Sequence, residues 1–460
     1  MPVDRARLAE GIAAEEASFV ASHPHCAELA ARGREHMVGG VPMSWMTKWP
    51  GPFPLHVTSA HGARFECADG IEHVDLCLGD TGAMCGHSPE PVVRAVAAQA
   101  ARGFTSMLPT SDAAVVAAEL TRRFGGADGA VRLWQFTLSA TDANRHVLRY
   151  ARFATGRPKV LVFDHCYHGT VDETFATLGG PDAAGRRPVV ARAGNIGPPV
   201  DPATTTVVVP FNDVAALETA LARGDVAAVL AEPALTNIGI VLPDAGFHDA
   251  LRSLTRRHGT YLVLDETHTL CAGPGGAVAA WGLDPDAVVV GKTIGGGVPI
   301  GAFGMTPELA AASAGHVDLE HVDVGGIGGT LAGNALSLAA ARATLEEVLT
   351  DDVFDRMDDL ASRWADGVSQ VAAAAGLDWH VTRLGCRAEY AFSAEPPRDG
   401  AQAAAADDFE LQQYLHLQAL VRGVLLTPFH NMALMSPATS EADVDAHTIA
   451  FEQATAFLVG

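Results

Sequence analysis

Lysine is rare in this chain, and one lysine stands where an amine could do covalent chemistry. Lysine and arginine together number 31 in the 460 residues, and only Lys48, Lys159 and Lys292 are lysines. Lys292 ends the run VVVGK and is followed by the glycines at 295–297. An amine becomes a nucleophile when desolvation or a nearby cation lowers its pKa. Lys292 is therefore the candidate for a Schiff base, although a surface lysine in a glycine-rich turn would show the same local pattern.

A carboxylate follows a second apolar run, YLVLD. Asp265 would be costly to bury at the end of that run unless a cation or a hydrogen-bond donor pairs with it. A protonated ring nitrogen of an aromatic cofactor is such a partner, and the pair would keep the ring an electron sink. An aspartate that only caps the following turn is the alternative.

The segment FTLSATDANRHVLRYARFATGRP predicts a helix that begins at an anion-binding end. Ser139 is the expected N-cap, and Asp142 three residues later completes a capping-box pattern. Gly156 and Pro158 are expected to end the helix. The free N–H groups of such an end, with the hydroxyls of Ser139 and Thr141, suit a phosphate. An ordinary capped helix is the alternative.

Two further segments offer contacts to a planar, phosphorylated ligand. In YHGTVDE, Tyr167 and His168 precede a glycine, where an aromatic ring could lie flat on a cofactor. A core aromatic fits that pattern equally well. In GGIGGTLAG, glycine-rich backbone leads through Thr330 into an alanine-rich helix. This segment is either another phosphate contact or a flexible lid.

From about residue 110 to 345, β-branched runs alternate with alanine-rich helical segments, which predicts an α/β fold with a mainly parallel sheet. The expected strands are Arg132–Thr137, Val160–Phe163, Val207–Val209, Val226–Ala231, Tyr261–Leu264 and Ala287–Val290. Ser139, Tyr167, Glu232, Asp265 and Lys292 each fall at or just beyond the carboxyl end of such a strand. Ligands bind at this edge of open α/β sheets, so we expect the five residues to meet in one crevice.

The flanking regions have a different pattern. Residues 3–35 are expected to be helical, and 50–78 to form antiparallel strands with glycine turns. The expected division is an N-terminal segment at 1–100 that contributes to a small domain, a large cofactor-binding α/β domain at 101–345, and a C-terminal small α+β domain at 346–460.

Composition narrows the function classes. A net charge of −23 argues against nucleic acid or an anionic membrane as a partner. No apolar stretch is long enough to span a bilayer and the N-terminus lacks a signal-peptide pattern, so a cytoplasmic protein is expected. The seven cysteines form no CxxC pair and are expected to be reduced thiols. No zinc-binding spacing occurs among the cysteines and the 19 histidines, so no metal is expected.

Taken together and in order, the segments resemble the class III aminotransferases, most closely the branch of glutamate-1-semialdehyde aminomutases and β-amino-acid aminotransferases. The similar stretches are LGDTGAMCGHSPEPVVRAV, FTLSATDANRHVLRYAR, YHGTVDE, LAEPALTNIGIVLP, LVLDETHTL, VVGKTIGGGVPIGAFGM and GTLAGNALSLAAARATL. The resemblance implies a pyridoxal 5′-phosphate (PLP) enzyme of fold type I. Its large domain would hold a mainly parallel mixed sheet, and its small α+β domain would come from both termini. The resemblance also implies a homodimer with the active site at the subunit interface.

The resemblance assigns roles by position. It implies that Lys292 carries the cofactor and that Asp265 pairs with its pyridine nitrogen. The other implied cofactor contacts are the phosphate cup of Ser139, Ala140 and Thr141, the residues around the ring Tyr167, His168, Glu232 and Thr267, and Thr330, which would reach the phosphate in the other subunit. Thr267 stands where relatives have an apolar residue beneath the ring.

The substrate side departs from the family. Relatives hold a substrate carboxylate with an arginine in a segment like GVNSPVR or with one in the C-terminal lobe, where this chain reads GVPMSWM and TPFHNMALMSP. Because neither segment contains arginine, Trp45, Met46 and His430 are expected to line a more apolar substrate pocket. Arg387 could supply another carboxylate fork. A structural cross-strand pair with Glu389 is the alternative.

The expected activity is that of a transaminase, which moves an amino group from an amine or amino acid to a keto acid or aldehyde through a Lys292 internal aldimine. The alternative is an aminomutase of the glutamate-1-semialdehyde 2,1-aminomutase kind. Racemases and phospho-lyases use the same scaffold. A non-catalytic PLP-binding protein is a further alternative, against which the presence of both Lys292 and Asp265 argues.

Overall fold

The computed structural model describes residues 3–126, 128–183, 185–314 and 327–460. By their contacts, the residues group into two compact units. The terminal unit comprises Met1–Pro89, Asp351–Pro396 and Ala406–Gly460, and the central unit comprises Glu90–Thr350 and Pro397–Ala405. Domain boundaries at 100/101 and 345/346 stay a prediction.

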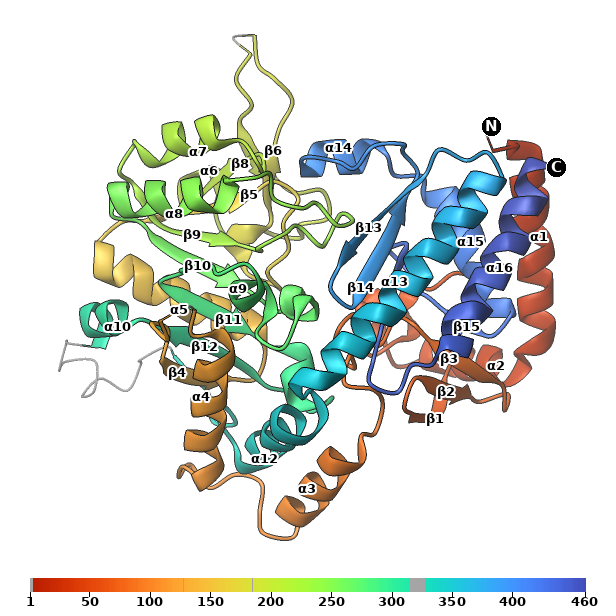
Figure 1. The fold of residues 1–460 in the computed structure, drawn as a ribbon, viewed down its shortest axis with the longest axis horizontal. Coiled ribbons are helices and arrows are strands. Elements are labelled where there is room, and N and C mark those ends of the chain that lie inside the picture. The colour runs from red at the N-terminus through yellow and green to blue at the C-terminus, as the bar shows by residue number, and fades with distance from the viewer. Residues whose placement is uncertain (1–2, 127, 184, 315–326) are drawn as a thin grey trace. The chain divides into compact units, whose positions relative to one another are not determined.

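A seven-stranded sheet forms the core of the central unit (Figure 1). Its spatial order is β4 (Leu133–Thr137), β12 (Gly301–Met305), β11 (Ala287–Val290), β10 (Tyr261–Asp265), β9 (Val226–Ala231), β5 (Lys159–Phe163) and β8 (Thr206–Val209). Only β12 runs antiparallel to its two neighbours, and the other pairings are parallel. The mainly parallel α/β sheet predicted from the sequence is therefore confirmed, and all six expected strands are present within a residue at each end.

Strand β12 was not expected from the sequence, because GAFGM carries two glycines and glycine weakens a strand. The structure gives both glycines a packing reason. A Cβ on Gly301 would lie 2.4 Å from the backbone of Ser139, and one on Gly304 would lie 2.7 Å from the ring of Trp134. The missing side chains allow β12 to lie against β4 and the turn that follows it.

The central unit also contains helices, some of which pack against the sheet and some against one another. They are α3 (Glu90–Ala100), α4 (Ser111–Phe124), α5 (Ala140–Thr155), α6 (Pro202–Thr205), α7 (Val214–Leu221), α8 (Phe247–His258), α9 (Gly276–Ala280), α10 (Pro307–Ala314), α12 (Ala335–Ala343) and α14 (Gly400–Ala405). The short turns η3 (Asp172–Thr174), η4 (Thr269–Ala272), η5 (Lys292–Gly295) and η6 (Thr344–Val348) and the hairpin of β6 (Ala176–Leu178) and β7 (Val189–Ala191) complete the unit.

Two small sheets and long helices form the terminal unit. One sheet is β1 (Val57–His61), β2 (Arg64–Cys67), β3 (Glu72–Asp75) and β15 (Val424–Leu425), and the other is β13 (His380–Leu384), β14 (Arg387–Ala391) and β16 (Met432–Leu434). The helices are α1 (Arg5–Ser22), α2 (Pro24–Gly33), α13 (Asp351–Ala374), α15 (Phe409–Val421) and α16 (Glu441–Val459), with short turns η1 (Val38–Gly40) and η2 (Ser44–Thr47).

Segments from both ends of the chain meet in this unit. Helix α1 packs along α15 and α16, and α13 packs along α16 (Figure 1). The expected N-terminal helical region is present as two helices, since Pro24 cannot donate its backbone nitrogen and starts a new helix at α2.

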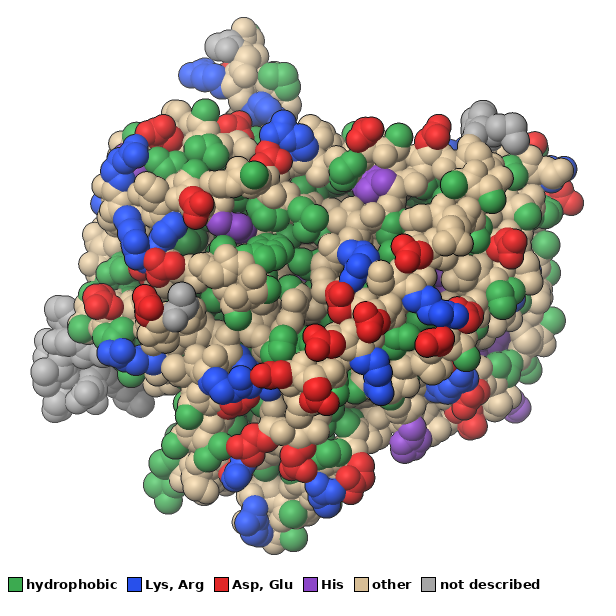
Figure 2. Space-filling view, in the orientation of Figure 1, with side chains coloured by type: hydrophobic (Ala, Val, Ile, Leu, Met, Phe, Trp, Pro, Cys, Tyr) green, Lys and Arg blue, Asp and Glu red, His purple; other side chains and the backbone are tan. Residues whose placement is uncertain are grey.

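The described helices and the surface agree with the composition. No helix among the described residues has the length and apolar content to cross a bilayer. On the face drawn in Figure 2, acidic and basic side chains are interspersed and no large field of one sign is visible. The acidic side chains visible on that face are therefore not gathered in one patch.

Candidate active site

The polar residues expected at the carboxyl ends of strands all lie at one edge of the central sheet. Asp265 is the last residue of β10, and Glu232 follows β9 directly. Lys292 lies two residues beyond the end of β11, which pairs in parallel with β10. Ser139 follows β4, and Tyr167 follows β5. Because all five strands run in the same direction, the five residues lie at the same edge of the sheet, and their meeting in one crevice stays a prediction.

Asp265 is the centre of a buried hydrogen-bond network. Its Oδ2 accepts from Nδ1 of His168 at 3.0 Å and from the side-chain amide of Asn144 at 2.8 Å, and its Oδ1 accepts from the backbone of Thr267 at 3.1 Å. Burial works to raise the pKa of Asp265, but the hydrogen bond and the charge of His168 outweigh it and hold that pKa below its usual range. The carboxylate is therefore ionised inside the protein.

His168 carries the matching positive charge. Burial opposes that charge, but the neighbouring Cys166 and the carboxylate of Asp265 together raise the pKa of His168 to about 10. The imidazolium and the carboxylate form an ion pair that is almost completely excluded from water, at 0% and 4% side-chain exposure. Such a pair persists only with good geometry and further hydrogen bonds, and Asn144 supplies one of these.

Lys292 adopts a left-handed backbone conformation at the start of the short turn η5. Its φ of +52° is uncommon for a residue with a side chain and marks local strain. The preceding Gly291 packs so closely on the next segment that an added Cβ would lie 2.9 Å from that of Ala140. The amine Nζ of Lys292 lies 2.9 Å from Nε2 of His268. The lysine is thus held on a fixed backbone, with an imidazole within hydrogen-bonding distance of its amine.

Glu232 holds the loop that carries Tyr167. Its Oε1 accepts from the backbone N–H of Tyr167 at 3.0 Å, and its Oε2 accepts from the backbone and the hydroxyl of Thr236. Burial raises the pKa of Glu232, against the lowering effect of nearby His168. Tyr167 itself is half-buried. Glu232 therefore positions the aromatic residue through its backbone.

The start of α5 has the features of an anion site. Ser139 caps the helix by accepting from the N–H of Asp142, as the capping pattern predicted, and Gly156 ends the helix in the left-handed conformation. The N–H groups of the first turn have no acceptor within a helix. Thr141 Oγ1 accepts from the N–H of Thr170 at 3.1 Å. A Cβ on Gly169, the residue before Thr170, would collide with that oxygen.

Thr330 is exposed, in a turn before α12. Helix α12 is capped by Asn334, whose side chain accepts from the N–H of Ser337. The glycines at 328 and 329 have positive φ, a backbone conformation that glycine adopts more readily than other residues. A contact of Thr330 with a second subunit stays a prediction.

Residues expected to line a substrate pocket from the terminal unit form two groups. The rings of Trp45 and Phe429 meet edge to face at 5.4 Å, and Nζ of Lys48 lies 6.0 and 5.7 Å from their centres. Met46 is exposed. Of the expected residues, Trp45 thus lies in an aromatic group with Phe429.

Arg387 lies in the second group and is fully buried. Its guanidinium binds Glu389 Oε2 at 3.1 Å, and Nδ1 of His430 lies 3.2 Å from Oε1 of the same carboxylate. The pair of Arg387 and Glu389 expected as one alternative is therefore present. It joins two residues of β14 instead of crossing between strands, because residues two apart on a strand share a face. His430 and the Arg387 guanidinium both bind this carboxylate.

Comparison with known proteins agrees with this geometry. The family model described as aminotransferase class III matches residues 45–454. The chain belongs to this family. Class III aminotransferases use PLP, so PLP is the cofactor of this enzyme.

Three relatives show the range within the family. A glutamate-1-semialdehyde 2,1-aminomutase from Sorangium cellulosum is 34% identical over 420 residues, which cover 88% of this chain and 89% of the relative. The crystal structure of a glutamate-1-semialdehyde-aminomutase from Pseudomonas aeruginosa PAO1 matches with a TM-score of 0.94 and 48% identity, covering all of both chains. A lysine-to-alanine variant of that protein, solved in complex with PMP, matches with the same TM-score at 47% identity over the full length of both chains. An omega-transaminase from Sphaerobacter thermophilus matches with a TM-score of 0.84 and 29% identity, covering 95% of this chain and 98% of that one.

The donor set of the central unit fits this class III cofactor. Asp265 Oδ1 accepts from the backbone N–H of Thr267, and a carboxylate oxygen can accept a further hydrogen bond, so it would hold a protonated ring nitrogen. The first turn of α5, with Ser139, Ala140 and Thr141, would hold the phosphate. The hydroxyl of Thr267 is buried and has no hydrogen-bond partner among the described residues. An unsatisfied buried hydroxyl is costly, which fits a bound group that takes that bond.

Sequence reasoning missed two residues of this class III site. Asn144 lies within α5, where the helical pattern marked only an apolar face, yet its amide binds Asp265. His268 follows Thr267 directly and was assigned no role, yet it contacts Lys292. The spacing of Asn144 from Ser139 places it more than one helical turn into α5, so it lies deeper than the capping residues. That spacing was the available signal for Asn144, and no comparable signal marked His268.

Proposed function

We propose that the enzyme is an aminomutase of the glutamate-1-semialdehyde 2,1 type, which moves an amino group between adjacent carbons of one molecule. The observation that carries this proposal is the similarity along the whole chain to proteins of that name, at 34% and 48% identity. In this reaction the C–N bond at C2 breaks, a new C–N bond forms at C1, and the carbonyl passes from C1 to C2. No second amine donor or keto acceptor is consumed.

The chain's own residues would divide the work. PLP, when bound, holds the substrate nitrogen and withdraws electrons from the carbon that loses a proton. The ionised carboxylate of Asp265, locked by His168 and Asn144, would keep the cofactor ring nitrogen protonated. The amine of Lys292, once free, would take the proton from one substrate-side carbon and return it to another.

His268 would hold that amine between proton transfers. Its Nε2 lies 2.9 Å from Nζ of Lys292, and the residue is 8% exposed, so few waters compete for this bond. Which nitrogen of His268 carries the proton is not fixed by heavy atoms. Either tautomer can exchange a proton with the lysine only through Nε2.

His268→Gln keeps a hydrogen-bonding group near Lys292 but cannot carry the proton, so we expect kcat to fall about 100-fold. Single-turnover kinetics at several pH values check this, and an unchanged pH profile of the proton-transfer step would contradict it.

The decisive experiment supplies glutamate-1-semialdehyde to the enzyme loaded with PMP, without any other amine or keto acid. An aminomutase yields a product with the amine on C1 and the ketone on C2, in many turnovers per subunit. Nuclear magnetic resonance of the product follows both carbons. Failure to isomerise, together with transfer from an apolar amine to a keto acid, would contradict the aminomutase proposal.

A transaminase that uses an apolar amine is the second candidate, favoured by one observation. The segment at 40–46 and the segment at 427–437 contain no arginine, and Trp45 and Phe429 contact each other there. The guanidinium of Arg387 already binds Glu389 inside the protein. These features suit an apolar group better than a carboxylate. A screen of amine donors, read as loss of absorbance of the lysine-bound cofactor, tests this candidate, and a coloured protein inert to every donor would indicate a non-catalytic PLP-binding protein.

We also propose a homodimer acting in the cytoplasm, on the strength of the family resemblance. The composite site would include Thr330 from the second subunit. Light scattering at working concentration should give the mass of two chains. A fully active monomer would contradict this proposal.

A further inference from the structure

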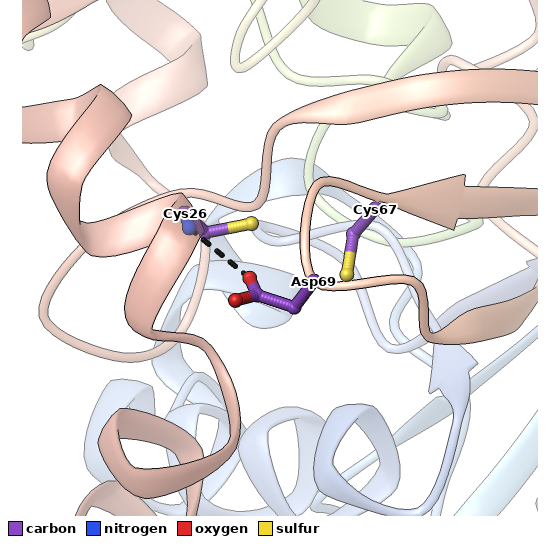
Figure 3. Close-up of side chains that lie close together, drawn as sticks. All are labelled: Cys26, Cys67 and Asp69. Carbon is purple, nitrogen blue, oxygen red and sulfur yellow. Dashed lines mark hydrogen bonds between the residues drawn. The ribbon is translucent and has the colours of Figure 1, made fainter.

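A second cluster of chemically reactive side chains lies in the terminal unit. Cys26 lies in the first turn of α2, Cys67 is the last residue of β2, and Asp69 lies in the turn between β2 and β3. The two sulfur atoms and a carboxylate oxygen lie within 4.8 Å of one another. Figure 3 shows Cys26 on helix α2 facing Cys67 and Asp69, which come from the end of β2 and the turn after it, with Asp69 hydrogen-bonded to the backbone of Cys26. This arrangement is separate from the PLP-binding residues, all of which belong to the central unit.

We propose that Cys26, Cys67 and Asp69 bind one zinc ion, with water as a fourth ligand. Two ligand atoms on a tetrahedral zinc ion stand about 3.5–3.8 Å apart, given bonds of about 2.3 Å to sulfur and about 2.1 Å to oxygen. The observed spacing of up to 4.8 Å needs a contraction of at most about 1.3 Å to reach that geometry. Two sulfur ligands select zinc over magnesium or calcium, which prefer oxygen.

The two cysteines lie close together inside the terminal unit. Both are 0% exposed, and they pack with Phe65 against Phe53 and Leu55. One divalent ion would displace both thiol protons, and the two thiolates would balance its charge.

Backbone N–H groups are already in place to support the ligand atoms. The two oxygens of Asp69 accept from the N–H groups of His25 and Cys26, at 2.7 and 3.0 Å. The sulfur of Cys26 accepts from the N–H of His56 at 3.3 Å. Two thiolates, one carboxylate and Zn²⁺ sum to one negative charge, which these N–H groups and the positive end of α2 offset. Each ligand oxygen and sulfur keeps further lone pairs for the metal.

This site could not be predicted from the sequence, since Cys26 is 41 residues from Cys67 and no family of zinc motifs has that spacing. The β2–β3 hairpin folds onto the start of α2 and closes the distance. Zinc would fasten α2 to the hairpin, and a ligand that binds only the folded state stabilises it. The alternative is that Asp69 only caps α2 and that the cysteines are core residues.

Cadmium is the probe, because cadmium thiolates have an ultraviolet charge-transfer absorbance that reports the number of sulfur ligands. Reduced holoenzyme is stripped with a chelator and titrated with cadmium and, separately, with zinc. We expect one ion per chain, a cadmium signal of two thiolates, and a melting temperature that rises with metal. Absence of stoichiometric binding, or binding without the thiolate signal, overturns the proposal.

Variants assign the ligands. Cys26→Ala and Cys67→Ala should each halve the cadmium signal and weaken zinc binding more than about 100-fold, and Asp69→Asn should keep the signal but weaken zinc binding about 10-fold or more. Cys386→Ala is the matched control, since Cys386 is also buried in the terminal unit and lies outside the cluster. Circular dichroism confirms that each variant is folded. An unchanged affinity in Asp69→Asn, or a loss in Cys386→Ala equal to that in Cys67→Ala, overturns the site as proposed.

Discussion

Two histidines, one in each unit, are completely buried and yet differ in charge. His168 in the central unit has its pKa raised to about 10, and His416 in the terminal unit has its pKa lowered to about 3. Burial lowers the pKa of both. His168 also lies against Asp265 and Cys166, whereas the amide of Asn431 and the charge of Glu389 raise the pKa of His416 too little to outweigh burial and the charge of nearby His430. The direct carboxylate partner, and not the depth, decides the charge of a buried imidazole.

The same contrast distinguishes a cluster of charged residues arranged for catalysis from one that stabilises the fold. In the central unit, the buried charges of Asp265 and His168 lie at the carboxyl edge of the sheet beside Lys292, where a cofactor would add a further charge. In the terminal unit, Glu389 is bound from both sides by Arg387 and His430. The first cluster is therefore arranged for chemistry, and the second for holding β14 and β16 together.

The largest effect should come from removing the amine beside the first cluster. Lys292→Ala should abolish covalent attachment of PLP and all turnover, because no other amine is expected at the sheet edge. Lys48→Ala and Lys159→Ala are the matched controls and should keep the absorbance of the lysine-bound cofactor. Borohydride reduction followed by peptide mass mapping checks the attachment site. A reduced adduct at Lys48 or Lys159 would show that the assignment of Lys292 is wrong.

Removing the carboxylate should have the next largest effect. Asp265→Asn should still bind PLP but lose turnover by several orders of magnitude, because an amide cannot keep the ring nitrogen protonated. The ion pair with His168 would also be lost. Turnover measured beside the cofactor absorbance separates the two functions. Near-normal turnover would show that Asp265 only caps the turn after β10.

Breaking the second cluster should affect stability instead of chemistry. Glu389→Gln leaves the fully buried Arg387 without its counter-charge, so we expect a loss of about 3–5 kcal/mol in the free energy of unfolding. Denaturant unfolding measures it. Asp445→Asn, which removes the exposed partner of Arg363, is the control and should change stability much less.

Kinetics on the same Glu389→Gln variant test whether Arg387 binds the carboxylate of a substrate. If Arg387 only supports the fold, the KM for amino acids should differ from that of the unsubstituted enzyme by no more than a few fold. The measurement is made at a temperature below the melting temperature of the variant. A large rise in that KM with little loss of stability would mean that the cluster of Arg387, Glu389 and His430 takes part in binding a substrate carboxylate.

The sequence predicted the central unit well because its signals are local. Strand patterns, the Ser139 cap and the glycine after α5 are each written in a few neighbouring residues, and the parallel sheet then brings their carboxyl ends to one edge. The direct contacts of that edge were not predictable in this way. Asn144 reaches Asp265 across 121 residues of sequence, and Cys26 meets Cys67 only because α2 folds onto a hairpin. Whether Arg387 binds a substrate or a neighbour also depended on packing, since its own strand supplies Glu389.

The smallest expected effect is a titration difference between the two buried histidines. Selectively ¹⁵N-labelled histidine lets nuclear magnetic resonance follow each ring as pH changes. The signal of His168 should be that of a charged ring from pH 6 to 9, and that of His416 should be neutral over the same range. Substitution of each histidine by glutamine assigns the signals.

The same shifts set the sign of two contributions to stability. Because the pKa of His168 is raised above its usual 6.5, its contribution is fully present below pH 6.5 and is lost as the pH rises toward 10. Because the pKa of His416 is lowered, the unfolded chain binds a proton that the folded one does not, and stability falls as the pH drops below 6.5. In Asp265→Asn the midpoint of His168 should fall by several pH units while that of His416 stays unchanged. A midpoint of His168 near 6.5 in the unsubstituted enzyme would contradict this account, since the Asp265 carboxylate would then not hold the ring charged at neutral pH.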